Sequence, residues 1–225
     1  MLNKSAGNMY DFVTHTWNAI KGACLHDCAY CYMKRWGKLN PVRFDSKELK
    51  TDLGKGNFIF VGSSCDMFAD DIQIEWIINT LDHCAKFDNR YLFQTKNPER
   101  FLKILESGGL MPKNFVFCTT LESDIFFPEI MNNSPLPHHR AYYTEKISRF
   151  CNTFVTIEPM MQFNLKPFTA MLNRCNAKQI NIGADSGGHG LPEPTKEELE
   201  SLIEAIKTFS TIDKKRNLER LLKSK

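Results

Sequence analysis

Three closely spaced cysteines are the strongest chemical signal in the sequence. They lie in the segment Cys24-Leu-His-Asp-Cys28-Ala-Tyr-Cys31, with three and then two residues between them. Three thiolates this close along the chain can hold three corners of an iron–sulfur cube, and the absence of a fourth cysteine at this spacing leaves one iron open. Because an open iron can bind a small molecule, the spacing predicts a [4Fe–4S] cluster that takes part in chemistry.

A zinc site is the alternative interpretation of these residues. It would take His26 or His15 as the fourth ligand beside the three cysteines. Zinc sites usually combine one close pair of cysteines with a second pair well downstream, which this sequence lacks. The spacing therefore favours the cluster, and a zinc-stabilised binding protein without redox chemistry stays open as the alternative.

The other five cysteines are widely dispersed and show no pairing pattern. In a reducing compartment such residues are free thiols. Cys65 follows an expected strand and is a candidate reactive thiol, with a small buried hydrophobe as the alternative. The remaining four fall on expected helix faces or inside a strand and are interpreted as core: Cys84, Cys118, Cys151 and Cys175.

The elements that must position these residues alternate between short strands and amphipathic helices. This alternation is typical of repeated β-α units with a parallel sheet. Two helix starts have capping chemistry, Asn97 before Pro98 and Thr195 three residues before Glu198. The expected strands are 13–18, 57–61, 90–95, 114–119, 153–157 and 178–182, and the expected helices are 46–53, 73–86, 98–107, 139–150, 165–175 and 195–209.

Six such units predict an α/β fold in the form of a partial (β/α)6 barrel that is open on one side. A doubly wound sheet is the alternative topology. In both, the loops after the strands share one face, where parallel α/β proteins bind ligands. The long connection Ile125 to His138 contains three prolines and is expected to cover part of the open mouth.

Length and composition predict one globular domain over residues 1–225. The chain has 225 residues, 42% hydrophobic and 24% charged, which excludes disordered and collagen-like classes. No apolar run is long enough for a membrane span and the first residues lack a signal peptide pattern, so we expect a soluble, cytoplasmic protein without membrane association. The net charge of +3 comes from a basic C-terminal tail at about 213–225, which either solvates a terminal helix or touches a phosphate backbone.

The cysteine segment, with Tyr30 as the aromatic before the last cysteine, resembles the signature of the radical S-adenosylmethionine (SAM) superfamily. Further segments are similar to a phage-associated, uncharacterised branch that is distantly similar to spore photoproduct lyase. The resemblance spans about 14–216 and implies the same partial barrel. The segments are Thr16-Trp-Asn18, Gly22-Ala-Cys24, Tyr30-Cys-Tyr32, Asp66-Met-Phe68, Thr95-Lys-Asn-Pro-Glu-Arg100, Ile157-Glu-Pro159 and Gly183-Ala-Asp-Ser-Gly187.

The resemblance implies two cofactors, a [4Fe–4S] cluster on Cys24, Cys28 and Cys31 and S-adenosylmethionine bound at the open iron. One electron from an external donor of the flavodoxin or ferredoxin type would cleave the sulfonium bond and yield a 5′-deoxyadenosyl radical. That radical abstracts hydrogen from a substrate, so the protein must bind the cofactor, exclude water and present one C–H bond.

The resemblance also assigns cofactor-binding residues after successive strands. Gly62-Ser63-Ser64 stands where the superfamily has a Gly-Gly-Glu turn, and here the Glu is missing. Thr120 and Glu122 are expected at the ribose or the methionine end, and Glu158 faces the positive charge of the cofactor. Ile182 and Gly183 resemble the backbone that meets the adenine, and Tyr30 is expected to pack beside it.

The substrate residues are expected at strand ends or on the lid and mix both charges. Lys96 and Arg140 suit a phosphate or carboxylate, and Cys65 could donate a hydrogen atom. A nucleotide or nucleic acid is one substrate class, whereas a mouth lined by Met67, Phe68, Phe126 and Phe127 would equally suit a peptide or small metabolite. The full candidate set is Cys65, Asp66, Gln94, Lys96, Arg140 and Asp185.

Overall fold

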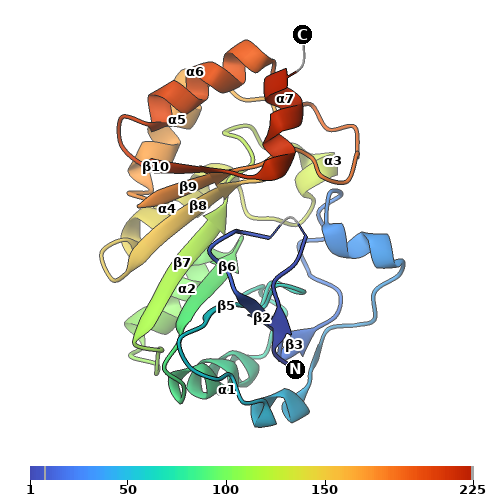
Figure 1. Cartoon of the computed structure of the whole chain (residues 1–225), viewed down its shortest axis with the longest axis vertical. Coiled ribbons are helices and arrows are strands. Elements are labelled where there is room, and N and C mark those ends of the chain that lie inside the picture. Colours follow the sequence, from blue (N-terminus) through green and yellow to red (C-terminus); the bar gives the residue numbers. More distant parts are fainter. Residues whose placement is uncertain (8, 224–225) are drawn as a thin grey trace.

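The computed structural model describes residues 1–7 and 9–223, and an eight-stranded sheet forms its centre (Figure 1). β1 runs antiparallel to β2, and every other neighbouring pair in this sheet is parallel. The order follows the chain without reversal, whereas a doubly wound sheet reverses its order at a switch point. Across the sheet the strands are β1 (Asn3–Lys4), β2 (His15–Trp17), β5 (Phe58–Val61), β6 (Arg90–Thr95), β7 (Asn114–Thr120), β8 (Asn152–Ile157), β9 (Gln179–Ile182) and β10 (Thr211–Lys214).

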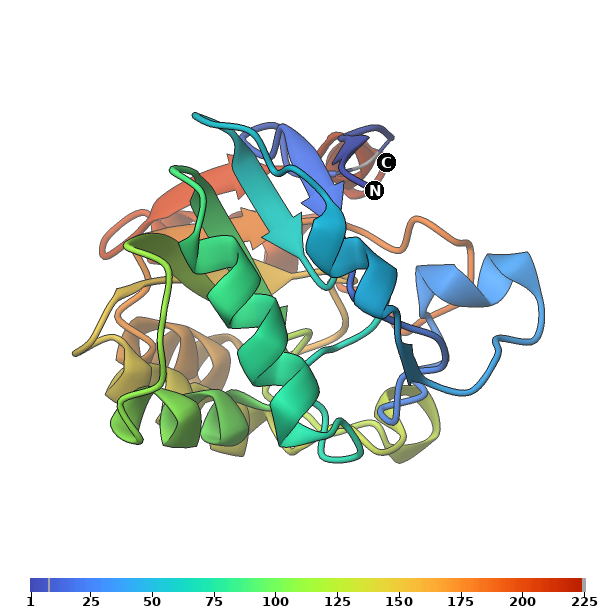
Figure 2. The ribbon, with the colours of Figure 1, turned by 90° about the horizontal axis from the view of Figure 1, so that it is seen from below.

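Helices connect the parallel strands, and α1, α2, α4, α5 and α6 pack on the outer side of the sheet (Figures 1 and 2). Both expected caps are present: Asn97 accepts a hydrogen bond from the backbone of Arg100, and Thr195 with Glu198 forms a capping box. The helices are α1 (Ile74–Ala85), α2 (Pro98–Glu106), α3 (Pro128–Met131), α4 (Pro137–Ile147), α5 (Leu165–Arg174), α6 (Lys196–Ile206) and α7 (Glu219–Lys223). Single-turn segments are η1 (Tyr32–Trp36), η2 (Ser46–Lys50) and η3 (Arg216–Leu218), and a small antiparallel pair joins β3 (Ile20–Lys21) to β4 (Arg43–Phe44).

Strand residues alternate between the two faces of the sheet, and each face is covered by different parts of the chain. Tyr91 and Phe93 pack with the helix side chains in one large cluster. Leu92 and Val116 belong to another cluster, which includes Tyr10 of the N-terminal segment. The N-terminal segment therefore covers the inner face, where the ends of the strands form the candidate site.

The six predicted strands and six predicted helical segments all exist, with ends that differ by a few residues and with η2 in place of a longer helix. The predicted connection 125–138 is not wholly irregular, because it contains α3 and the start of α4. No helix in the described residues has the length and apolar character to cross a membrane.

The described part of the predicted basic tail is folded. The chain from Thr211 to Lys214 is a strand paired with β9, and η3 and α7 follow it. The side chain of Lys215 is almost fully buried against Glu158, so this part of the segment is integral to the sheet. Ser224 and Lys225 lie outside the described residues.

Candidate active site

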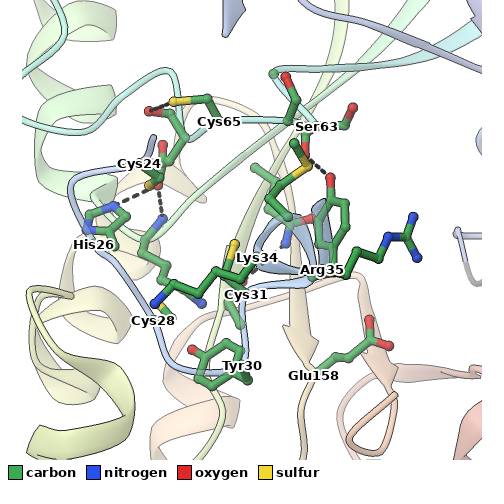
Figure 3. Close-up of a pocket in the computed structure, with 18 of the residues that line it drawn as sticks. Cys24, His26, Cys28, Tyr30, Cys31, Lys34, Arg35, Ser63, Cys65 and Glu158 are labelled. Atoms are coloured by element: carbon green, nitrogen blue, oxygen red, sulfur yellow. Dashed lines mark hydrogen bonds and ion pairs between the residues drawn. The ribbon is translucent and has the colours of Figure 1, made fainter. Parts of the chain in front are cut away.

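A cavity of about 790 Å³ opens at the carboxyl ends of the parallel strands. Its walls come from the N-terminal segment, the cysteine loop, η1 and the carboxyl ends of β5 to β10 with the turns after them, so residues far apart in sequence meet here (Figure 3). Pockets for small organic ligands span roughly 300–1,000 Å³, which places this cavity near the upper end. It has room for more than one small group.

Cys24, Cys28 and Cys31 lie on one loop between β3 and η1, and all three line the cavity (Figure 3). A hydrogen bond from Cys65, together with the nearby His26, lowers the pKa of Cys24 to about 7 despite burial. Burial raises the pKa of Cys31, and the contact with Cys24 raises that of Cys65. The surroundings thus favour the thiolate of Cys24 and the thiol forms of Cys31 and Cys65.

The cysteine loop is held by the segment that begins with α3. Backbone hydrogen bonds join Ala29 to Ile130 at 2.8 Å and Asn133 to His26 at 3.1 Å. The Asn133 amide donates to the carbonyl of Leu25 at 3.0 Å. The connection 125–138, predicted to cover the mouth, therefore supports the cysteine loop through these hydrogen bonds and acts as its brace. The sequence did not indicate this role.

A buried pair, His26 and Asp66, ties the same loop to the sheet. The two side chains lie 2.9 Å apart, and Asp66 also accepts hydrogen bonds from the Thr95 hydroxyl at 2.9 Å and the Lys96 backbone at 2.8 Å. Burial would raise the pKa of Asp66, but these donors hold it below its usual value. Asp66 is therefore a structural anchor at the cavity wall, where the sequence predicted a substrate contact.

Glu122 is the centre of a buried charge cluster. Its carboxylate lies 2.6 Å from Lys96 Nζ and 2.8 Å from Arg140 Nη1, and it accepts a hydrogen bond from the Tyr30 hydroxyl. Burial would raise the pKa of Glu122, but the two cations outweigh it and hold the pKa far below its usual value. Only one of the cations, Lys96, also lines the cavity; Arg140 is fully buried behind it, which corrects its expected place on the lid.

A second ion pair, between Glu158 and Lys215, also lines the cavity. Glu158 lies 2.5 Å from Lys215 Nζ and accepts from the Asn217 amide at 3.1 Å. A Cβ on Gly183 would lie 3.0 Å or less from side-chain atoms of Glu158 and Asn217. Glycine at this position therefore lets these two side chains lie against the backbone of residue 183. This explains Gly183 as a packing requirement, beside its predicted place near the adenine.

Tyr10 contributes a polar wall that sequence reasoning missed. Its hydroxyl donates to Gln94 Oε1 at 2.8 Å and contacts Thr156 Oγ1 at 2.7 Å, and Lys215 Nζ lies 4.6 Å from its ring centre. Burial raises its pKa well above the usual value, so the phenol stays protonated. No motif surrounds Tyr10, and only the fold brings it to the strand ends.

The cavity collects most of the predicted site residues. Gly62 has a positive φ of 80°, as the predicted close turn after β5 requires. Met67 and Phe68 are buried in the core, so they do not form the expected apolar mouth. The predicted residues that line the cavity are Cys24, Cys28, Tyr30, Cys31, Gly62, Ser63, Ser64, Cys65, Asp66, Gln94, Lys96, Thr120 and Glu158, and those outside its lining are Glu122, Arg140, Ile182, Gly183 and Asp185.

Asp185 makes a local turn at one side of the site. Its carboxylate accepts from the backbone of Gly187 at 3.0 Å and contacts His189 Nδ1 at 2.7 Å. These contacts lower its pKa, although burial opposes them. Its predicted catalytic role stays a prediction.

In the described residues no three His, Cys, Asp or Glu side chains converge on a single metal ion. A cubane cluster differs from a single ion because each thiolate binds a different iron. Three cysteines on one loop that all line a roomy cavity, with one thiol of lowered pKa, match the donor set of such a cluster. The residues present therefore fit an iron–sulfur group.

The same fold occurs in spore photoproduct lyase. A mutant of that enzyme with bound AdoMet and dinucleoside spore photoproduct matches with a TM-score of 0.68, covering 92% of this chain and 78% of that one at 10% identity. A complex with the dinucleoside gives 0.65 with the same coverage and identity. No protein-family model and no curated protein matches the sequence. The likeness establishes a mixed α/β fold with a mostly parallel sheet like that of the lyase.

Proposed function

We propose that the protein is a radical SAM enzyme. The observation that carries the proposal is the cysteine loop: Cys24, Cys28 and Cys31 line one cavity at the strand ends of a fold shared with spore photoproduct lyase, a radical SAM enzyme. When bound there, the cluster and S-adenosylmethionine supply a 5′-deoxyadenosyl radical that abstracts hydrogen from the substrate. The chain then forms one domain with the open six-unit barrel of that superfamily.

The residues of the cavity divide into three tasks. The three cysteines hold the cluster, and Gly62, Ser63 and Ser64 offer backbone groups to the methionine end of the cofactor. Thr120 and Glu158 also line the cavity, where hydroxyl and carboxylate oxygens can accept hydrogen bonds from a ribose. Tyr30 packs beside the cofactor, and Glu122 acts indirectly by holding Tyr30 and Lys96 in place.

A nucleotide or a nucleic acid is the proposed substrate class. Lys96 lines the cavity with its charge already matched by Glu122, which gives a fixed donor for a phosphate oxygen. Cys65 lines the cavity next to the cysteine loop and is the proposed thiol that returns a hydrogen atom. A peptide or small metabolite would be indicated if only such compounds stimulated cofactor cleavage.

Replacement of one cysteine tests the proposal. After anaerobic reconstitution, the wild-type chain should contain about four irons with matching sulfide and should release 5′-deoxyadenosine when reduced, with flavodoxin or a chemical reductant as donor. Cys28→Ala should lose both, because two thiolates cannot hold the cube with one iron open. Cys84→Ala removes a buried thiol on α1 and is the matched control, with unchanged iron content.

The same measurements decide between the alternatives. One zinc without sulfide in the wild-type protein would contradict the proposal and support a zinc-stabilised binding protein. Stimulation of 5′-deoxyadenosine release by oligonucleotides supports the substrate class. Lys96→Met should abolish that stimulation but leave the slow background cleavage nearly intact, whereas a loss of cofactor affinity would assign Lys96 to the carboxylate of S-adenosylmethionine.

A further inference from the structure

The segment that follows the cysteine loop carries an exposed ring beside cations. It comprises η1 and the residues up to Lys38, here called the rim segment, and it projects from the body of the molecule (Figure 2). Trp36 is 70% exposed, and the guanidinium of Arg35 lies 4.9 Å from the centre of its ring. The indole and the guanidinium together offer a flat π face and a positive charge to a ligand.

The charges of the rim segment are less compensated than those inside the cavity. Lys96 and Lys215 inside the cavity each have a carboxylate within 2.6 Å. On the rim segment Lys34 pairs with Asp27, but within residues 1–7 and 9–223 no ion pair involves Arg35 or Lys38. Both also line the cavity, so two cations without a carboxylate partner in the described residues face the space where the substrate is expected.

The rim segment is fixed relative to the cavity. The Tyr32 hydroxyl donates a hydrogen bond to the carbonyl of Ser63, in the turn after β5 that also lines the cavity. Arg35 lies 5.8 Å from the Tyr32 ring, and Figure 3 shows Tyr30, Lys34 and Arg35 close to the cysteine loop. A ligand that binds the rim segment is therefore held at a defined position beside the reacting space.

We propose that the rim segment is the docking site for a single nucleic-acid strand. An unpaired base stacks on Trp36 while neighbouring phosphates contact Arg35 and Lys38, the combination of ring and cations typical of single-strand sites. The inference rests on the proposed function, because the cavity beside the rim segment receives the nucleotide that reacts.

Two other occupants fit these observations less well. A duplex keeps its bases stacked inside, so it offers no free base face to Trp36. An acidic electron-transfer protein would match the ring and the cations, but two of these cations line the cavity itself, where the substrate and not the electron donor is expected. Because Arg35 and Lys38 line the cavity, their ligand also reaches the substrate space.

Binding of a fluorescein-labelled oligothymidylate of about twelve nucleotides, within the usual ~4–16 of a single-strand site, tests the proposal by anisotropy. With the cluster-loaded protein, Trp36→Ala should weaken binding about tenfold, the loss of one stacked base. Arg35→Gln with Lys38→Gln should weaken it and lower the dependence of log K on log salt by about 1.4, since two phosphate contacts are lost at ~0.7 each.

Matched controls remove an exposed ring and two exposed cations at the other end of the sheet. Phe150→Ala removes an exposed ring before β8, and Lys113→Gln with Lys178→Gln removes two exposed cations before β7 and β9. These variants should bind the oligonucleotide like the wild type. Equal losses in the control and rim variants would overturn the proposal, as would tighter binding of a duplex of the same length.

Three further results separate this inference from the proposed function and from an electron-donor surface. If Trp36→Ala keeps background cleavage of S-adenosylmethionine but loses oligonucleotide binding, both hold. If cleavage is absent in the wild type while the rim variants still lose binding, the docking site holds and the radical SAM function fails. If the rim variants bind the oligonucleotide normally but impair reduction by flavodoxin, the rim segment is an electron-donor surface and the docking proposal is wrong.

Discussion

Single residues at this site gain their properties from burial combined with a partner. Glu122 shows this best, because it is fully buried yet ionised between Lys96 and Arg140. The sequence places Glu122 after the fourth predicted strand, but nothing in it pairs Glu122 with Arg140, eighteen positions further along the chain. The three cysteines were found from spacing alone because their chemistry is local, whereas the charge cluster depends on tertiary packing.

Glu122→Gln should destabilise the protein by about 3–5 kcal/mol, because it leaves two buried cations without a counter-charge. The free energy of unfolding from chemical denaturation measures this. Glu204→Gln is the matched control, since Glu204 pairs with Lys207 on the exposed face of α6 and should change stability far less. Equal stability of the two variants would show that the buried cluster contributes nothing to the fold.

The difference in stability between the wild type and Glu122→Gln should also depend on pH. Burial opposes ionisation of Glu122, but Arg140 and Lys96 hold its pKa below the ordinary 4.5. A carboxylate with a lowered pKa in the folded state stabilises the protein above its unfolded pKa and loses that contribution as the pH falls. The wild type should therefore be more stable than Glu122→Gln, and the difference should be largest above about pH 5. It should shrink as the pH falls. A difference that grows on acidification would contradict the assigned charge state.

At the scale of elements, periodicity predicted the central strands and long helices because each has one buried face. β10 was missed, since Thr211-Ile-Asp-Lys214 is short and polar and borders a run of basic residues. Only the structure shows this strand, because it is defined by backbone pairing with β9. The brace by α3 was missed for the same reason, because backbone hydrogen bonds between distant loops leave no pattern in the sequence.

Asn133→Ala tests that brace. It removes the hydrogen bond to the Leu25 carbonyl, whose loss is worth about 0.5–1.5 kcal/mol, and so should reduce cluster occupancy at limiting iron up to about tenfold. Visible absorbance and iron content during reconstitution measure the effect. Asn173→Ala, an exposed amide on α5, is the control and should load like the wild type. Normal loading of Asn133→Ala would mean that the cysteine loop needs no support from this segment.

At the scale of the whole molecule, the cavity joins the N-terminal segment, the cysteine loop and residues at the ends of six strands, β5 to β10. A ligand that contacts all of these parts binds only when they are folded together. Its binding energy is therefore added to the stability of the folded state, by RT ln(1 + [L]/Kd). This makes ligand-induced stabilisation a test of the cavity that does not depend on turnover.

S-adenosylmethionine at one hundred times its dissociation constant should stabilise the cluster-loaded protein by about 2.7 kcal/mol. For a chain of this length that is a rise in Tm of roughly 5–10 °C, measured by calorimetry under anaerobic conditions. Cys28→Ala should show no rise, because the open iron that binds the cofactor is missing. A single transition that moves as a whole agrees with one domain, since strands at both edges of the sheet then unfold together. Two transitions, of which only one responds to S-adenosylmethionine, would instead divide the chain into two units and assign the cavity to one of them.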